Sequence, residues 1–173
     1  RFALGALGYV RAGKPTRIVS WLAAAGPQGY DGRSSTYHAT VKEYVYDTTL
    51  IYPPMLELLT YLRANGFETW ISSGGTLDFI RVFAPEVYGV PTHRTIGTEF
   101  EREARTVGDG VAIFRLPRID HLNDGDGKPV GIDRHIGRRP IFVAGNVLSG
   151  GDIAMMRYSR SQPGPTFQLL INH

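Results

Sequence analysis

The sequence contains no cysteine among its 173 residues, which excludes disulfide bridges, zinc–thiolate sites and cysteine nucleophiles. Lysine is scarce as well, with 3 residues against 16 arginines that are scattered along the chain. A nucleic-acid-binding face needs basic residues gathered in a stripe with aromatic residues between them, and no such stripe is visible. We therefore expect no nucleic-acid partner, whereas attraction to small anions such as phosphates stays open.

Long hydrophobic runs are missing too. No apolar stretch approaches the roughly 20 residues that a membrane-spanning helix requires, and no signal peptide is visible, so we expect no membrane partner. The hydrophobic fraction of 42% and the charged fraction of 20% are ordinary for one globular domain. Because the chain starts at Arg1 and stops just after an apolar run, we expect a piece of a longer protein. The compartment is not indicated.

The segment 139–156 combines a short apolar run, a polar glycine-rich loop and the start of a helix. Ile141 to Ala144 predicts a strand that is buried on both faces, as in a parallel sheet. The loop 145–151 follows, and Asp152 then stands where a helix N-cap belongs. Open α/β sheets bind ligands at such loops. Taken alone, the segment is explained equally well as an ordinary capped turn.

A similar unit lies earlier in the chain. The stretch from Pro53 to Gly66 predicts a helix, with proline in its first turn and Gly66 at its C′ position. Phe67 to Ser72 predicts a strand, and Ser73-Gly74-Gly75 predicts a tight turn. Thr76 to Phe83 predicts a second helix that is broken near Pro85. This strand too ends in a small polar loop.

Further elements complete an alternating pattern. Residues 94–99 and 111–116 predict two strands, with the charged stretch 101–105 and a hairpin-like turn at 108–110 between them. Together these segments predict a surface excursion. Lys128 to Ile136 predicts a helix, and Thr166 to Ile171 a last buried strand. Strands that alternate with helices predict a parallel α/β sheet with three layers, because right-handed crossovers place helices on both faces.

Three loops at strand ends or helix starts carry the polar groups of interest. Ser73-Gly74-Gly75 offers a hydroxyl and backbone N–H donors, and Lys128 offers an ammonium, both of which suit phosphate oxygens. The loop from Asn146 to Asp152 offers an amide and a carboxylate, which suit a hard cation such as Mg²⁺. Lys128 is followed by Pro129 and is not part of a P-loop. Ser73 is not in a Gly-x-Ser-x-Gly elbow.

Two other polar features of the sequence do not predict a metal site. Asp124-Gly125-Asp126 resembles the start of a calcium loop, but Lys128 stands where the third ligand should be. We therefore expect a plain Asp/Gly turn there. The five histidines show no metal-ligand spacing.

The three loops, in this order and spacing, resemble motifs two, three and four of the haloacid dehalogenase superfamily. The likeness is greatest to its phosphoserine-phosphatase-like hydrolases, and it covers roughly residues 44–173. It implies a three-layer α/β/α Rossmann-like fold. It also implies a Mg²⁺-dependent phosphatase that acts on a small phosphorylated substrate through an aspartyl-phosphate.

The resemblance assigns a role to each matching residue. Ser73-Gly74-Gly75 would hold the transferring phosphoryl group through the serine and the two glycine N–H groups. Lys128 would neutralise the charge of the phosphate and of the nucleophile. Asp152, with Asn146 beside it, would position Mg²⁺. Positioning and charge neutralisation would then supply most of the rate enhancement.

The sequence departs from the family pattern in two places. Motif one, Asp-x-Asp-Gly-Thr, is absent. Its nearest match, residues 47–50, has Val45 where the nucleophile should be. Asn146 stands where an acid is common, so its oxygen would bind the metal without a charge.

The missing motif leads to three expectations about the fold. We expect residues 1–48 to be the remnant of a helical cap or a linker, and 49–173 to be a core that lacks its first strand. An incomplete sheet would have two unpaired edges inside it. We therefore expect this chain to be unstable alone, or another segment or a second chain to complete the sheet.

Two alternatives remain open. The chain could be a catalytically inactive member of the superfamily that serves as a binding or structural protein. It could also be a generic phospholigand-binding α/β domain that holds an anion near Ser73 and Lys128 without a metal. At the level of single residues, Ser73 and Asp152 could merely cap helices and Lys128 could be a solvated lysine. A cation at a helix start is, however, unfavourable for the helix dipole.

Overall fold

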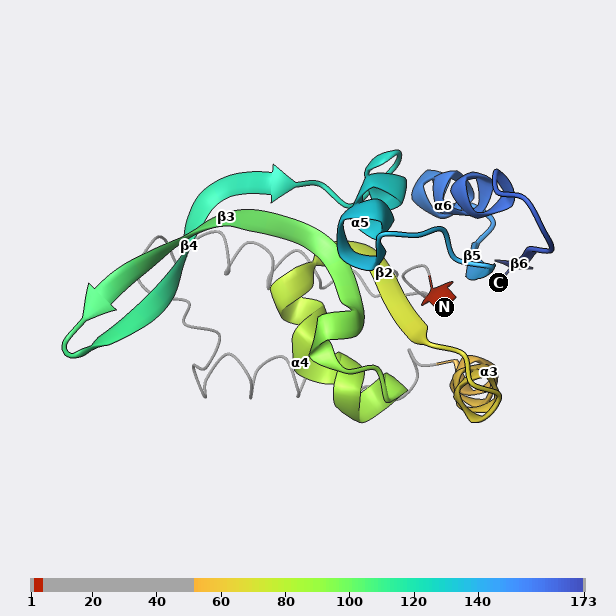
Figure 1. Cartoon of the computed structure of the whole chain (residues 1–173), viewed down its shortest axis with the longest axis horizontal. Coiled ribbons are helices and arrows are strands. Elements are labelled where there is room, and N and C mark those ends of the chain that lie inside the picture. Colours follow the sequence, from red (N-terminus) through yellow and green to blue (C-terminus); the bar gives the residue numbers. More distant parts are fainter. Residues whose placement is uncertain (1, 5–51, 173) are drawn as a thin grey trace.

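The computed structural model describes residues 2–4 and 52–172, which form one six-stranded sheet with helices on both faces (Figure 1). The strand order is β4-β3-β2-β1-β5-β6. All neighbouring strands are parallel except β3 and β4, which are antiparallel. The strands are β1 (Phe2–Leu4), β2 (Thr69–Thr76), β3 (Thr95–Val107), β4 (Gly110–His121), β5 (Phe142–Asn146) and β6 (Phe167–Ile171).

The helices form the outer layers and confirm the expected three-layer α/β/α architecture. Alternating residues of β2 and β5 face opposite cores: Trp70 and Val143 pack with α5 and α6, while Ile71 and Ala144 pack with α4 and α3. The helices are α3 (Pro53–Ala64), α4 (Leu77–Tyr88), α5 (Gly127–Ile136) and α6 (Gly150–Arg160), with a short 3₁₀ turn at Thr92–Arg94.

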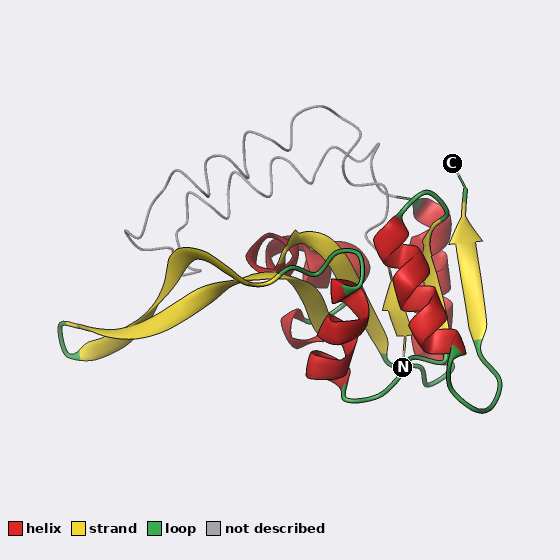
Figure 2. Cartoon of the chain, turned by 90° about the horizontal axis from the view of Figure 1, so that it is seen from above, coloured by secondary structure: helices red, strands yellow, loops and turns green. Residues whose placement is uncertain are grey.

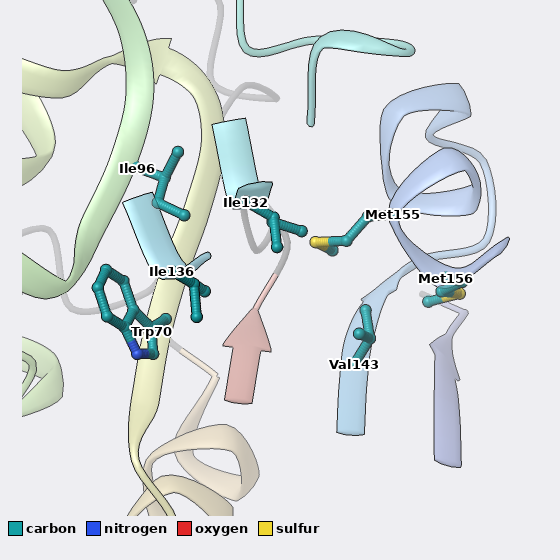
Figure 3. Close-up of a cluster of buried hydrophobic side chains, with 7 residues drawn as sticks. All are labelled: Trp70, Ile96, Ile132, Ile136, Val143, Met155 and Met156. Atoms are coloured by element: carbon teal, nitrogen blue, oxygen red, sulfur yellow. The ribbon is translucent and has the colours of Figure 1, made fainter. Parts of the chain in front are cut away.

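The larger core lies under α5 and α6. Ile132 and Met155 are both fully buried, and their side chains point toward one another between the two helices (Figure 3). Trp70 and Val143 close the cluster from the sheet. This packing fixes the starts of α5 and α6 relative to the ends of the central strands.

β1 occupies the centre of the sheet. Its three residues pair in parallel with β2 on one side and with β5 on the other, so Ala3 lies between Trp70 and Val143. The prediction of two unpaired edges inside the sheet is therefore wrong, because a segment of this same chain fills the gap. Three apolar residues are too few to give a strand signal in the sequence. The division of the chain near residue 48 stays a prediction.

Several element boundaries differ from the sequence prediction. β2 continues through residues 73–75 to Thr76, with an irregular register between Ser72 and Thr76, instead of ending in a free turn. α4 continues through Pro85 to Tyr88. A proline removes one N–H from the helix, and the buried face of α4 holds the helix together on both sides of it. β6 is an edge strand with Phe167 and Leu170 more than half exposed, and not a buried one.

The hairpin predicted from strands 94–99 and 111–116 and the turn 108–110 is confirmed, and the charged stretch 101–105 lies inside its first strand, β3. β3 and β4 form a long hairpin that extends away from the helices (Figure 2). The hairpin turns at Gly108, whose φ of 57° favours glycine. Its charges are paired locally, as in the ion pair between Arg105 and Glu103. The two strands run further than predicted, because the charged stretch 101–105 also pairs with β4 although it lacks the hydrophobic alternation that predicts a strand.

The sequence also predicts a short helix at residues 18–25 and a loop at 28–37. Both of them, like the segment 47–50, lie outside the described residues. Among the residues that are described, no helix is long and apolar enough to cross a membrane.

The packing between α5 and α6 gives a first prediction. Ile132→Ala should lower the free energy of unfolding by about 2 to 5 kcal/mol, because it leaves a cavity in the core. Val130→Ala is the matched control on the same helix, since Val130 is 48% exposed, and it should change the value by less than about 0.5 kcal/mol. Urea denaturation measures both. Equal effects would show that α5 does not pack as described.

Candidate functional site

The three loops selected from the sequence meet at the carboxyl edge of β2 and β5. Lys128, the second residue of α5, donates a hydrogen bond from Nζ to the carbonyl oxygen of Ser72 over 3.1 Å. Its ammonium also forms an ion pair with the carboxylate of Asp152. The two side chains are only 2% and 1% exposed. This buried pair links the start of α5 to the end of β2 and the start of α6.

Asp152 is not the N-cap of α6. Ser149 occupies that position, and its Oγ accepts a hydrogen bond from the N–H of Asp152 over 3.3 Å. The carboxylate of Asp152 is therefore directed at the site, where Oδ1 meets Lys128 and Oδ2 accepts from the N–H of Asn146 over 2.8 Å. A Cβ on Gly145 would lie 2.8 Å from Oδ2, so only glycine fits beside this carboxylate.

Asn146 closes the loop that follows β5. Its side-chain oxygen accepts a hydrogen bond from the N–H of Leu148 over 2.7 Å. The side chain of Leu148 is 84% exposed, so the loop turns outward there. Asn146 and Asp152 are the two residues expected to hold a metal. The hydrogen bond from the N–H of Asn146 to the carboxylate of Asp152 brings them together.

Ser73 lies at the irregular end of β2. Its side chain is buried, and its Oγ accepts a hydrogen bond from the N–H of Gly75 over 3.1 Å. The carbonyl oxygen of Gly74 accepts from Thr98 Oγ1 over 2.8 Å. The N–H of Gly75 is therefore satisfied by the Ser73 oxygen, while this bond leaves the O–H of Ser73 as a donor, and both N–H and O–H are groups that can donate to an anion.

Asn123 is a site residue that the sequence reading missed. It is fully buried, and its side-chain nitrogen donates to Ser72 Oγ over 3.1 Å and to the carbonyl oxygen of Ser73 over 2.8 Å. Its own N–H donates to Thr98 Oγ1 over 3.2 Å. Asn123 therefore fixes the end of β2 against β3. An asparagine before an Asp-Gly sequence looks like a loop residue, so no sequence signal distinguished it.

Asp124 is a second missed residue. Its carboxylate accepts a hydrogen bond from the N–H of Gly125 over 2.8 Å, which fits the turn predicted at this point. It also lies beside two of the loops: a Cβ on Gly74 would be 3.6 Å from Asp124 Cγ, and a Cβ on Gly151 would be 2.6 Å from Asp124 Oδ1. The turn 124–126 is therefore part of the rim of the site.

The side-chain oxygens of Asp152 and Asn146 are the kind of ligand that a hard cation such as Mg²⁺ prefers. Each oxygen of Asp152 and the side-chain oxygen of Asn146 has one protein partner and keeps a second lone pair. Mg²⁺ needs only one or two carboxylates, because water and phosphate complete its shell. No cluster of three or more histidine, cysteine, aspartate or glutamate side chains that could hold a metal occurs in residues 2–4 and 52–172.

Comparisons with known proteins give a matching family and a similar fold. The model of the haloacid dehalogenase-like hydrolase family matches residues 28–157. The chain is similar in structure to a phosphoserine phosphohydrolase-like protein from Francisella tularensis subsp. tularensis SCHU S4, with a TM-score of 0.53 and 18% identity, over 93% of this chain and 82% of that chain. No curated protein matches the sequence.

A second similar structure is a conserved protein of unknown function from Anaerococcus prevotii DSM 20548. Its TM-score is 0.47 and its identity 26%, over 59% of this chain and 27% of that chain. The present chain therefore spans about a quarter of the length of that relative.

The buried ion pair gives a second prediction. Lys128→Met should lower the free energy of unfolding by about 3 to 5 kcal/mol, because it leaves the carboxylate of Asp152 buried without a cation. In the double variant Lys128→Met/Asp152→Asn, the loss in the free energy of unfolding should be smaller than the sum of the losses in the two single variants, because each single change breaks the same interaction.

The exposed pair of Arg134 and Asp120 provides the control. Its side chains are 51% and 55% exposed and their charged atoms are 3.7 Å apart. Arg134→Met, also on α5, should change the free energy of unfolding by less than about 1 kcal/mol. If Lys128→Met proved as mild as Arg134→Met in urea denaturation, the pair would not be buried as described.

Proposed function

The chain belongs to the haloacid dehalogenase-like hydrolase family, and from that membership we propose that its three loops form the phosphate and metal site of a Mg²⁺-dependent phosphomonoester hydrolase. Membership confirms the resemblance seen in the order of the loops and supports a phosphatase-type function. The observation that carries the proposal is the ion pair of Lys128 and Asp152, which is buried at the carboxyl edge of the central strands.

A buried ion pair is weak evidence for a purely structural role. Removing two charges from water costs several kcal/mol per ion, and well-packed apolar residues often stabilise a fold as well or better. The pair also lies beside the end of β1, where strands on both sides contribute loops, and open α/β sheets bind ligands at this place. A ligand site accounts for buried charges here better than stability does.

Each residue then has a chemical role. The hydroxyl of Ser73 and the N–H groups of residues 74 and 75 would donate hydrogen bonds to the oxygens of a phosphate group. Lys128 would add a point positive charge close to that group. Asp152 and Asn146 would hold Mg²⁺ through oxygen atoms, and the bound metal would neutralise negative charge on the phosphate.

The nucleophile in this proposal is an aspartate that does not lie among the described residues. Its carboxylate oxygen would attack phosphorus and the ester P–O bond would break, which releases the alcohol and leaves an aspartyl-phosphate. Water would then hydrolyse that intermediate to phosphate and restore the carboxylate. Positioning and charge neutralisation by the three loops would supply most of the rate enhancement.

One observation favours a second candidate, a non-catalytic member of the family that binds a phosphorylated ligand or serves as a structural protein. The strand at the centre of the sheet is Phe2–Leu4, and the next residues in sequence are Gly5, Ala6, Leu7 and Gly8, with no acidic residue before Asp31. A hydrolase of the proposed type needs an aspartate after its central strand. Beyond β1, the cap or linker assigned to the chain up to residue 48, and the substrate that a cap would select, remain proposals as well.

Phosphate binding tests the site itself. Inorganic phosphate should bind the chain in the presence of Mg²⁺, as measured by calorimetry. Ser73→Ala should weaken binding about tenfold or more, since it removes a hydrogen bond to a charged group. Ser161→Ala is the control, because Ser161 is exposed and its hydroxyl donates to the carbonyl oxygen of Arg157 in its own helix turn. Equal affinities in the two variants would place phosphate elsewhere.

Turnover tests whether a nucleophile within this chain completes the site. Because the chain as given has no Asp-x-Asp-Gly-Thr segment, we expect it to bind phosphate but not to hydrolyse p-nitrophenyl phosphate above background in Mg²⁺. Rapid hydrolysis that Asp152→Asn abolishes would show that a nucleophile within the chain completes the site. Background rates in the native chain and in the variant would agree with the expectation.

A further inference from the structure

Two successive carbonyl groups at the end of β2 are each held by a side chain from another part of the chain. Asn123, in the loop after β4, donates from its side-chain nitrogen to the carbonyl oxygen of Ser73 over 2.8 Å. Thr98, on β3, donates from Oγ1 to the carbonyl oxygen of Gly74 over 2.8 Å. The register between β2 and β3 is irregular in this stretch, so buried side chains supply hydrogen bonds to its backbone.

Holding a carbonyl group also fixes the N–H group of the same peptide bond. A trans peptide is planar, and its C=O and N–H point in opposite directions. The carbonyl of Ser73 shares its peptide bond with the N–H of Gly74, and the carbonyl of Gly74 shares its own with the N–H of Gly75. Asn123 and Thr98 therefore orient the two N–H groups that the proposed function assigns to phosphate, and these N–H groups point away from the two side chains.

The amide of Asn123 is itself held in one orientation. A carbonyl oxygen can only accept a hydrogen bond, so the amide nitrogen faces Ser73 and the amide oxygen faces His121, whose Nε2 is 3.4 Å away. Nε2 of this buried histidine then carries the proton. A Cβ at Gly131 of α5 would collide with the amide oxygen and lie 3.0 Å from Nε2. Glycine is unfavourable inside a helix, yet here it makes room for the amide and the histidine.

We propose that Asn123 and Thr98 are positioning residues that direct the N–H groups of Gly74 and Gly75 at a bound phosphate. Neither side chain contacts the anion, and each acts through one peptide group of β2. Because these N–H groups are oriented before the anion arrives, the loop does not have to reorganise on binding. This inference rests on the proposed phosphate site and assigns the residues that set its geometry.

A purely structural role for the two side chains makes a different prediction. Loss of their hydrogen bonds would then lower the free energy of unfolding, and the folded molecules would bind phosphate as before. Leu59→Ala is the control for such a loss of stability, because Leu59 of α3 is fully buried and its truncation leaves a cavity. Leu59 packs in the core cluster that contains Ala144, on the α3 side of the sheet.

The experiment measures the dissociation constant of inorganic phosphate for the full chain by calorimetry in saturating Mg²⁺, under conditions in which each variant is folded. Thr98→Val keeps the shape of the side chain and removes its hydroxyl. Asn123→Leu has a similar shape and removes both N–H donors. Each should weaken phosphate binding about tenfold, since a misdirected N–H loses a hydrogen bond to a charged group. Leu59→Ala should change the dissociation constant less than about twofold, because it lies away from these peptides.

Amide NMR adds a readout at the atoms concerned. When phosphate is added in Mg²⁺, the amide-proton signals of Gly74 and Gly75 should shift in the native chain and in Leu59→Ala. Asn123→Leu should mainly reduce the shift at Gly74, and Thr98→Val should mainly reduce the shift at Gly75. Each side chain would then affect the peptide group whose carbonyl it holds, and a general loss of stability does not produce this pattern.

The outcomes separate this inference from the proposed function. If the native chain binds phosphate and both positioning variants bind it equally tightly, the positioning role is overturned and the phosphate site stands. An equal loss of affinity in Leu59→Ala and Thr98→Val would also overturn the role, since lower stability would explain both. If Asn123→Leu does not fold, Thr98→Val decides alone. If the native chain binds no phosphate in Mg²⁺, the proposed function fails and this inference fails with it.

Discussion

The buried ion pair of Lys128 and Asp152 is the interaction on which the arrangement of the site depends. It joins the first turns of α5 and α6, and the second hydrogen bond of Lys128 ties both helix starts to the end of β2. Because two desolvated charges are costly unless each keeps its partner, these three elements cannot shift independently. The apolar cluster between α5, α6 and the sheet holds the two helices in the same relative position. The site is therefore held in place by one polar link and one apolar layer.

The sequence predicted the parts of the fold that carry a clear hydrophobic period. Helices 53–64 and 128–136 and the strand 141–144 lie within one or two residues of their expected positions. The three loops were found because each combines glycine with a polar residue next to an apolar run, and the structure brings Ser73, Lys128 and Asp152 to one edge of the sheet.

The features that the sequence did not predict have physical reasons. β1 is too short to show the periodicity that marks a buried strand. The strands of the β3–β4 hairpin were predicted, but they extend beyond 94–99 and 111–116 to Thr95–Val107 and Gly110–His121. Asp152 was expected to cap α6, but Ser149 three residues earlier does so, and either residue type suits that position. Asn123 and Asp124 act through contacts with residues about 25 to 50 positions away in the chain. Such contacts leave no local signal.

The central claim is that phosphate and a divalent cation bind together at these loops. A crystal structure of the chain grown with Mg²⁺ and inorganic phosphate tests it most directly. The account predicts phosphate within hydrogen-bond distance of Ser73 Oγ and Lys128 Nζ, with a cation on the carboxylate of Asp152. The account would be contradicted if, at saturating concentrations, phosphate bound only at other surfaces. Neither phosphate nor Mg²⁺ would then contact Lys128 or Asp152.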